Sequence, residues 1–370
     1  MEPSQTARRH PYLHYEYYFD SQGRPDEFAK LLNCFQAPLY FLLKGRLGLR
    51  DPYPLFMQDP GFHLVRRADG GLSSIEPRQA WSSVPYFDIG IYRLKGAEGT
   101  AKLCELLDEG HFVMLQTHSQ RVPFYQHFQS LDFPFDEPLH NSRQNHFFTI
   151  LGYDEQSFYY MDAVREIRQH DFVPYRGFKH MGIVSKAALE PAFSSFMNLY
   201  TFEPRQAAVE ATLLPQGTLD MLDQVRKRAR EPAEERDGLV MENELQALDS
   251  LVAACENGEL LLQGKPDRYD LNWCALMEWK FDNLRQRKYI LLRCMEMSPL
   301  FQQSPYRELV QTWSDNTTLW LVFVSKLRKL LRTQQFPAPQ ETAAILSKLR
   351  ASEYALIDNL DHFVSKIFNN

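Results

Sequence analysis

Three side chains in the first half of the chain are of the types that cysteine-dependent group transfer uses: the Cys34 thiol, the His146 imidazole and the Asp162 carboxylate. In such chemistry a thiolate attacks an acyl carbon and the imidazole accepts the thiol proton. A carboxylate beside the imidazole fixes its tautomer and stabilises its protonated form. We therefore predict that Cys34 is the nucleophile, His146 the base and Asp162 the residue that orients the base.

The segment between His146 and Asp162 predicts how these two residues would meet. Two runs rich in aromatic and β-branched residues, 147–153 and 158–161, are separated by the polar sequence Asp-Glu-Gln-Ser at 154–157. This pattern is typical of a β-hairpin. A turn at that point places His146 opposite or diagonal to Asp162, within reach of a cross-strand side-chain contact.

The surroundings of Cys34 favour a reactive thiol. A helix N-terminus and an imidazolium are the usual means of lowering a cysteine pKa. Asn33 is a suitable N-cap, and the mostly apolar residues 31–47 predict a buried helix that ends near Gly48. Proline is easiest to accommodate in the first turn of a helix, so Pro38 favours a start a few residues after Asn33.

Each of these residues also has a purely structural interpretation. Most free cysteines are small buried hydrophobes, and Cys34 lies among leucines and phenylalanines. His146 would then close the hairpin, and Asp162 would form a turn at the end of a strand. Several other histidines in this half of the chain are alternative bases: His111, His118, His127 and His140. The hairpin favours catalysis, as does the absence of a better cysteine, because the other four lie on helix-like segments: Cys104, Cys255, Cys274 and Cys294.

Composition narrows the class of protein. The net charge of −6, with lysines and arginines dispersed through the chain, argues against a nucleic-acid partner. The first thirty residues are charged and lack a long apolar run, which predicts neither a signal peptide nor a membrane span and favours the cytoplasm. The five cysteines form an odd set without Cys-x-x-Cys spacing, which argues against a disulfide framework and a thiolate metal site.

A chain of 370 residues is expected to form about two domains. We predict an α+β domain at 1–205 and an all-α helical bundle at 206–370. Within the first, the residues from 53 to 92 are dense in proline, glycine and aromatics, which predicts loops and small strands that wall a cleft. The second contains long segments of helical periodicity separated by prolines and glycines: 218–230, 242–256, 271–297, 306–333 and 341–367.

Four elements together resemble a known family. They are Asn-Cys34 before an apolar helix, the strand-like 110–116, Val-Pro-Phe-Tyr at 122–125, and the hairpin 146–162. They resemble the N-terminal domain of the butirosin-biosynthesis H type, a relative of the bacteriocin-processing cysteine peptidases with a papain-like fold. The resemblance covers roughly residues 30–200, and the helical remainder is similar to the C-terminal region that such proteins often carry.

The resemblance implies a cysteine-dependent acyltransferase in natural-product biosynthesis. It would move an acyl group from the phosphopantetheine thioester of an acyl or peptidyl carrier protein, through an acyl-Cys34 intermediate, to an amine. No cofactor or metal of its own is implied. Two alternatives stay open. One is a cysteine peptidase or amidase with the same three residues, and the other is an inactive papain-like module that binds a partner through its helical half.

Two departures from the family pattern affect the predicted site. Thr117 and His118 stand where the pattern has an acidic residue. Phe28 stands where a papain-like oxyanion glutamine would precede the nucleophile by about six residues. The backbone N–H of the nucleophile is the natural first oxyanion donor, and Gln22 and Gln36 are candidates for the second.

Overall fold

The computed structural model describes residues 32–78, 81–118, 145–161, 173–175, 178–193, 198–213, 216–260, 262 and 273–368. The fold is mixed α+β with two antiparallel sheets. The chain divides into a first unit, residues 1–52 and 83–210, and a second unit, residues 53–82 and 211–370. Each is described by itself below.

The sheet of the first unit has the strand order β3-β9-β4-β5-β6-β8-β7. Its strands are β3 (Phe87–Tyr92), β4 (Val113–His118), β5 (Asn145–Tyr153), β6 (Ser157–Met161), β7 (Val173–Tyr175), β8 (Phe178–Ser185) and β9 (Asn198–Pro204). The predicted hairpin is confirmed, because β5 and β6 pair antiparallel with Thr149 opposite Met161. Asp154 stabilises the turn, since its carboxylate accepts the backbone N–H groups of Gln156 (2.8 Å) and Ser157 (2.7 Å).

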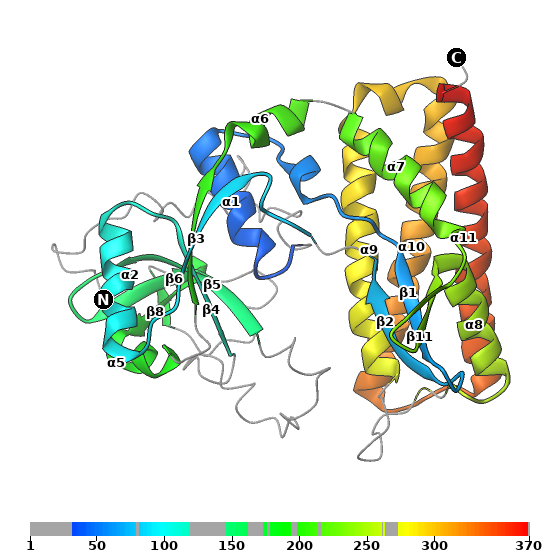
Figure 1. Ribbon diagram of the computed structural model, residues 1–370, viewed down its shortest axis with the longest axis horizontal. Coiled ribbons are helices and arrows are strands. Elements are labelled where there is room, and N and C mark those ends of the chain that lie inside the picture. Colours follow the sequence, from blue (N-terminus) through cyan, green and yellow to red (C-terminus); the bar gives the residue numbers. More distant parts are fainter. Residues whose placement is uncertain are drawn as a thin grey trace. The chain divides into compact units, whose positions relative to one another are not determined.

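Two helices cover opposite faces of this sheet (Figure 1). Helix α2 (Gly96–Asp108) packs leucines such as Leu103 against Phe148 and Tyr160. Helix α1 (Gln36–Leu47) packs on the other face, next to β9, and is buried along most of its length. It ends at Gly48, whose φ of 64° is the left-handed conformation that suits glycine at a helix C-terminus. The short helices α5 (Lys186–Leu189) and η6 (Glu190–Ala192) follow β8.

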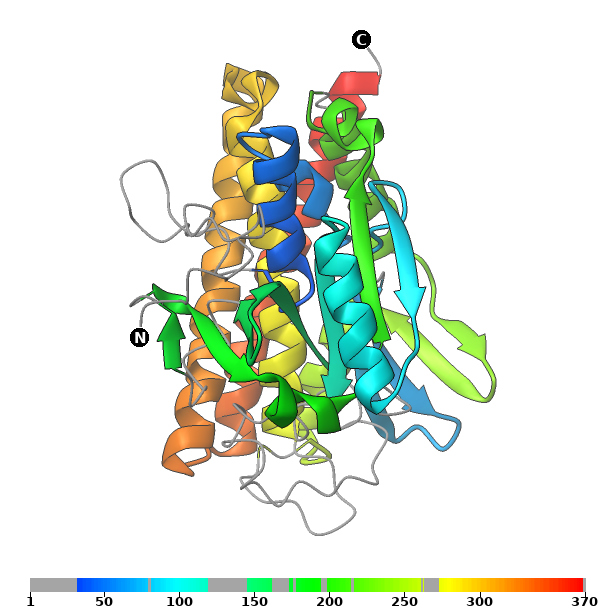
Figure 2. The ribbon, with the colours of Figure 1, turned by 90° about the vertical axis from the view of Figure 1, so that its left-hand side faces the viewer.

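Long helices dominate the second unit. They are α7 (Gln216–Ala229), α8 (Glu244–Glu256), α9 (Trp273–Met297), α10 (Ser304–Thr333) and α11 (Pro339–Phe368), with short turns η3 (Tyr53–Phe56) and η7 (Pro299–Gln302). The five predicted helical segments are therefore confirmed as helices. Helices α9 and α10 run side by side (Figure 2), and α11 packs against α8 and α10. Helix α6 (Gln206–Leu213) lies where the chain passes from the first unit to the second.

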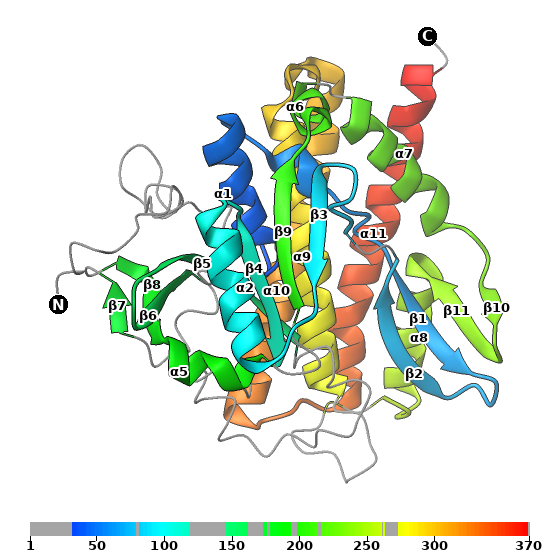
Figure 3. The ribbon, with the colours of Figure 1, turned by 60° about the vertical axis from the view of Figure 1, so that its left-hand side comes forward.

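The prediction that residues 206–370 are entirely helical is wrong. Strands β10 (Glu234–Arg236) and β11 (Leu239–Asn243) form a hairpin whose turn residues, Asp237 and Gly238, both have positive φ. An Asp-Gly turn of this kind matches the twist of a two-residue hairpin. The sheet continues from β11 to β1 (Phe62–Arg67) and β2 (Leu72–Pro77), as Figure 3 shows.

The predicted domain at 1–205 is interrupted, because residues 53–82 belong to the second unit. Strand β1 pairs with β11, with Val65 opposite Met241. Phe62 of β1 is fully buried and meets Phe281 edge to face at 5.4 Å between ring centroids. Backbone pairing and aromatic burial therefore hold this segment in the second unit.

Candidate functional site

Cys34 lies in the turn that leads into α1, between two residues that cap the helix. The Asn33 side-chain oxygen accepts the backbone N–H groups of Phe35 (3.0 Å) and Gln36 (2.9 Å). In return the Gln36 side-chain oxygen accepts the Asn33 backbone N–H at 3.4 Å. This reciprocal arrangement is a capping box. Helix α1 itself begins at Gln36 with Phe35 at the N-cap position, so Asn33 caps the turn that precedes the helix, and Pro38 lies in the first turn of α1 as expected.

The position of Cys34 differs from those of the other four cysteines, all of which are free thiols. Cys255, Cys274 and Cys294 are buried, and burial raises the pKa of Cys255 and Cys274 to about 12 and that of Cys294 well above its usual value. Burial also raises the pKa of Cys104 on α2. Cys34 is half-buried and lies in the turn just before the N-terminus of α1.

The residue after Cys34 joins α1 to β5. The Phe35 ring meets the Phe147 ring edge to face at 4.8 Å between centroids, and it lies 5.7 Å from the Phe202 ring of β9. Phe147 directly follows His146 in β5. The structure therefore brings the chain segments that carry Cys34 and His146 together.

The His146 ring itself lies on the other face of the sheet. Side chains alternate between the faces of a strand, so His146 and Phe148 share one face and Phe147 takes the other. The His146 ring stacks on that of Phe148 at 6.3 Å, and Phe148 belongs to the core beneath α2. His146 is 6 % exposed and pairs with Thr117 of β4. The predicted role as base requires the His146 ring to reach the thiol, whereas in this structure the ring packs with Phe148 toward α2.

The other predicted site residues are distributed as follows. Asp162, Gln22, Phe28, His127 and His140 lie outside the described residues, as does the side chain of His118. His111 is held between two carboxylates, with Nε2 3.4 Å from Glu109 and Nδ1 3.5 Å from Glu203.

Gln36 has an unused hydrogen-bond donor beside Cys34. Its side chain is 3 % exposed, and its Nε2 atom makes no hydrogen bond to any residue that the structure describes. The Gln36 oxygen is occupied by the capping box. The amide N–H₂ group is thus available to a developing oxyanion, which makes Gln36 the better supported of the two predicted candidates.

A polar cluster that the sequence analysis missed lies on the α1 face of the sheet. Gln116 of β4 is paired with Phe147 on one side and Asn198 on the other. Its side-chain oxygen accepts hydrogen bonds from the Tyr200 hydroxyl (2.7 Å) and the Asn198 amide (3.1 Å). The Asn198 oxygen is buried without a hydrogen bond to the described residues. Gln116 is far in sequence from Asn198 and Tyr200, and the only signal was an amide directly after the apolar run 112–115.

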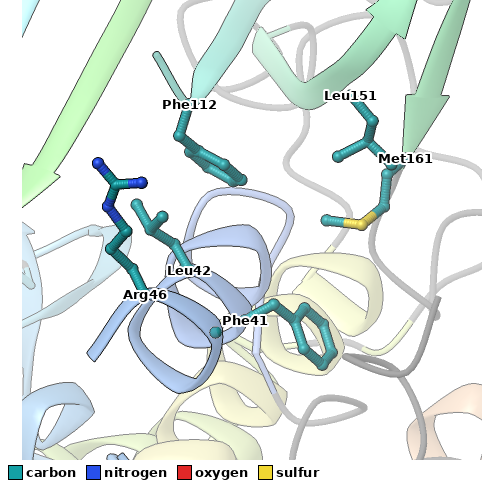
Figure 4. Close-up of a pocket in the computed structure, with 7 residues that line it drawn as sticks. Phe41, Leu42, Arg46, Phe112, Leu151 and Met161 are labelled. Carbon is teal, nitrogen blue, oxygen red and sulfur yellow. The ribbon is translucent and has the colours of Figure 1, made fainter. Parts of the chain in front are cut away.

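A small pocket opens beside the C-terminal half of α1 (Figure 4). Its walls are mainly apolar and come from α1, from Phe112 before β4, from Leu151 of β5 and from Met161 of β6. Arg46 contributes the charged group at its edge and lies 3.9 Å from Glu203. Because α1 rises about 1.5 Å per residue, the pocket is more than one helical turn from Cys34 and does not adjoin the thiol.

Comparisons with known proteins leave the chain without a family assignment. No family model matches it, and no curated protein matches it at a significant level. Among the described residues, no three His, Cys, Asp or Glu side chains are grouped so that they could hold a metal ion. In the same part of the chain, no helix is both long and apolar enough to cross a membrane.

Proposed function

We propose that the first unit is a papain-like acyltransferase domain with Cys34 as its nucleophile. The observation that supports this most strongly is the half-buried thiol at a capped helix N-terminus, where the helix packs on an antiparallel sheet. A helix dipole and the first free N–H groups stabilise both a thiolate and the oxyanion of an acyl intermediate.

The proposed reaction has two steps. The Cys34 thiolate attacks the carbonyl carbon of a thioester carried by the phosphopantetheine of a carrier protein, and the carrier thiol leaves with the proton that His146 holds. An amine then attacks the acyl-Cys34, loses its proton to His146 and forms an amide, while the Cys34 thiolate is released. Asp162 would orient the imidazole. The Cys34 backbone N–H and the Gln36 amide would bind the oxyanion.

The nucleophile and the base do not have equal support. The role of Cys34 is supported by its position at the start of α1, whereas the role of His146 is supported only by its residue type, the hairpin and the resemblance. Its ring stacks with Phe148 beneath α2, so the proposed reaction requires the imidazole to reach the α1 face. This position also favours the second candidate function, an inactive papain-like module that binds a partner.

Intact-protein mass spectrometry with small acyl thioesters tests the proposal. Wild type is compared with Cys34→Ala, with His146→Ala and with Cys104→Ala, the matched control for a second half-buried thiol in the first unit. We expect an adduct of one acyl group that Cys34→Ala abolishes and Cys104→Ala retains. Discharge of the adduct by an added amine faster than by water supports the transferase.

The other outcomes decide between the alternatives. Discharge by water alone identifies a hydrolase. An adduct that forms equally fast in His146→Ala removes His146 from the mechanism but keeps the nucleophile. No adduct with any thioester, together with a Cys34 that does not react with iodoacetamide, contradicts catalysis and leaves the binding module.

A further inference from the structure

Three arginines surround one buried carboxylate in the second unit. Asp59 is fully buried, and its Oδ1 accepts the Gly61 backbone N–H at 2.8 Å. Its Oδ2 lies 3.2 Å from Arg228 Nη1 and 3.7 Å from Arg78 Nη1. Arg287 Nη1 donates to the Asp59 carbonyl oxygen at 2.9 Å. We call Asp59, Arg78, Arg228 and Arg287 the arginine cluster.

Arg78 is the unusual member of the cluster. Its side chain is only 3 % exposed, yet none of its three guanidinium nitrogens makes a hydrogen bond to a described residue. The guanidinium lies close to Gly61, where a Cβ atom would come within 2.7 Å of its central carbon. A buried guanidinium with five N–H donors is costly unless acceptors satisfy them. Asp59 at 3.7 Å supplies charge but no hydrogen bond.

The balance of charge around the cluster is positive. Three guanidinium groups lie around Asp59, which is the single carboxylate of the cluster. Burial lowers the pKa of Arg287 to about 10, which still leaves its guanidinium charged at neutral pH. The nearby Lys288 and Glu353 neutralise one another at 2.9 Å. Glu244 lies 3.6 Å from Lys288, and both of its oxygens lack a hydrogen bond to the described residues. Within the arginine cluster itself, guanidinium groups therefore outnumber carboxylates.

We propose that the arginine cluster binds a phosphate group, with Arg78 as its principal ligand. A phosphate dianion matches the excess charge, and its oxygens accept paired hydrogen bonds from a planar guanidinium. Arg228 is one-third exposed, so the cluster has a charged member at the surface through which an anion can reach it. The ligand is inorganic phosphate or the phosphate of a monoester, since both present the same group. This proposal is independent of the chemistry proposed for Cys34.

The test measures binding and thermal unfolding of the full chain. Isothermal titration with inorganic phosphate and with glycerol 3-phosphate is combined with melting curves in phosphate and in sodium chloride of equal ionic strength. The variants are Arg78→Gln and, as matched control, Arg236→Gln, an exposed arginine of the same unit. We expect both wild type and Arg236→Gln to bind and to melt at a higher temperature in phosphate. Arg78→Gln should weaken binding at least about tenfold.

Each result of this experiment bears on the proposal. Loss of the phosphate-dependent rise in melting temperature in Arg78→Gln supports it. A purely structural Arg78 would change the melting temperature equally in both salts, and that result overturns it, as does the absence of binding to wild type. If Arg78→Gln does not fold, Arg228→Gln replaces it and must weaken binding. Tighter binding of glycerol 3-phosphate than of phosphate assigns the site to a monoester, and the reverse assigns it to the free ion.

Discussion

The rings of Phe35 and Phe147 meet edge to face, with their centroids 4.8 Å apart. This contact holds the turn that carries Cys34 against the strand that begins beside His146. It also occupies the α1 face of β5 at that point, which leaves His146 on the opposite face because strand side chains alternate. The contact between these two phenylalanines thus brings the backbone segments of Cys34 and His146 close together in space, while the His146 side chain points to the opposite face of the sheet.

We predict that Phe35 and Phe147 are energetically coupled. Phe35→Ala should lower the free energy of unfolding by about 1–3 kcal/mol, because a half-buried aromatic ring loses its packing. In a double-mutant cycle measured by urea unfolding, Phe35→Ala and Phe147→Ala should show a coupling of about 0.5–1.5 kcal/mol. Phe158→Ala, in the core beneath α2, is the control, and its effect on the free energy of unfolding should simply add to that of Phe35→Ala. Additive effects of Phe35 and Phe147 would contradict the contact.

We predict that the capping box tunes both the stability of α1 and the reactivity of its thiol. Asn33→Ala removes the oxygen that accepts the Phe35 and Gln36 N–H groups and should cost about 1 kcal/mol in unfolding free energy. It should also slow alkylation of Cys34, because a frayed helix end stabilises a thiolate less well. Asn33→Asp preserves the acceptor and is the matched control for stability. Equal alkylation rates in wild type and Asn33→Ala would show that the cap does not affect the reactivity of the Cys34 thiol.

We predict that Cys34 is the first thiol to be alkylated in the native protein. Burial raises the pKa of each of the other four cysteines, so each is protonated at neutral pH. Three of them are also buried away from the reagent: Cys255, Cys274 and Cys294. Peptide mass spectrometry after a short treatment with iodoacetamide at pH 7.5 should find the label on Cys34. All five cysteines should react once the chain is unfolded in urea. Earlier labelling of Cys104 than of Cys34 would be the contrary result.

Local patterns predicted much of this fold. The cap at Asn33, the turn at Asp154 and the helical periodicity after residue 215 depend on neighbours in sequence, and all three are present. The Asp237-Gly238 turn is an equally local signal of a hairpin, and the expectation of an all-helical second half did not include it.

The direction of the His146 side chain could not be predicted in this way. Strand β5 is apolar on both faces, because helices cover both sides of the sheet, so alternation does not indicate which face α1 takes. A bulge between Ile150 and Gly152 also shifts the pairing of β5 with β6. The assignment of residues 53–82 to the second unit could not be predicted for a similar reason. Strand β1 pairs with β2 but also with β11, which is far away in sequence. Such pairings depend on the whole chain.

We predict that Glu244 makes the protein less stable as the pH rises through neutrality. Burial raises its pKa from about 4.5 to about 7 in the folded state. A raised folded-state pKa means that the stability associated with the proton is fully present below about pH 4.5 and is lost as the pH rises through 7. Glu244→Gln removes this dependence. Its stability relative to wild type should therefore increase by about 1–3 kcal/mol between pH 5 and pH 8.

Urea unfolding of wild type and Glu244→Gln at pH 5, 6, 7 and 8 measures this difference. Glu256→Gln is the matched control, because Glu256 is an exposed residue at the end of the same helix α8 and should shift stability by a constant amount. Lys288 stays protonated throughout, since the carboxylates of Glu353 and Glu244 keep its pKa raised despite the opposing effect of burial. The pH dependence of the stability difference between wild type and Glu244→Gln is therefore assigned to the Glu244 carboxylate. A wild-type curve parallel to that of Glu244→Gln would show that Glu244 is ionised at pH 5 and that its burial is compensated by Lys288.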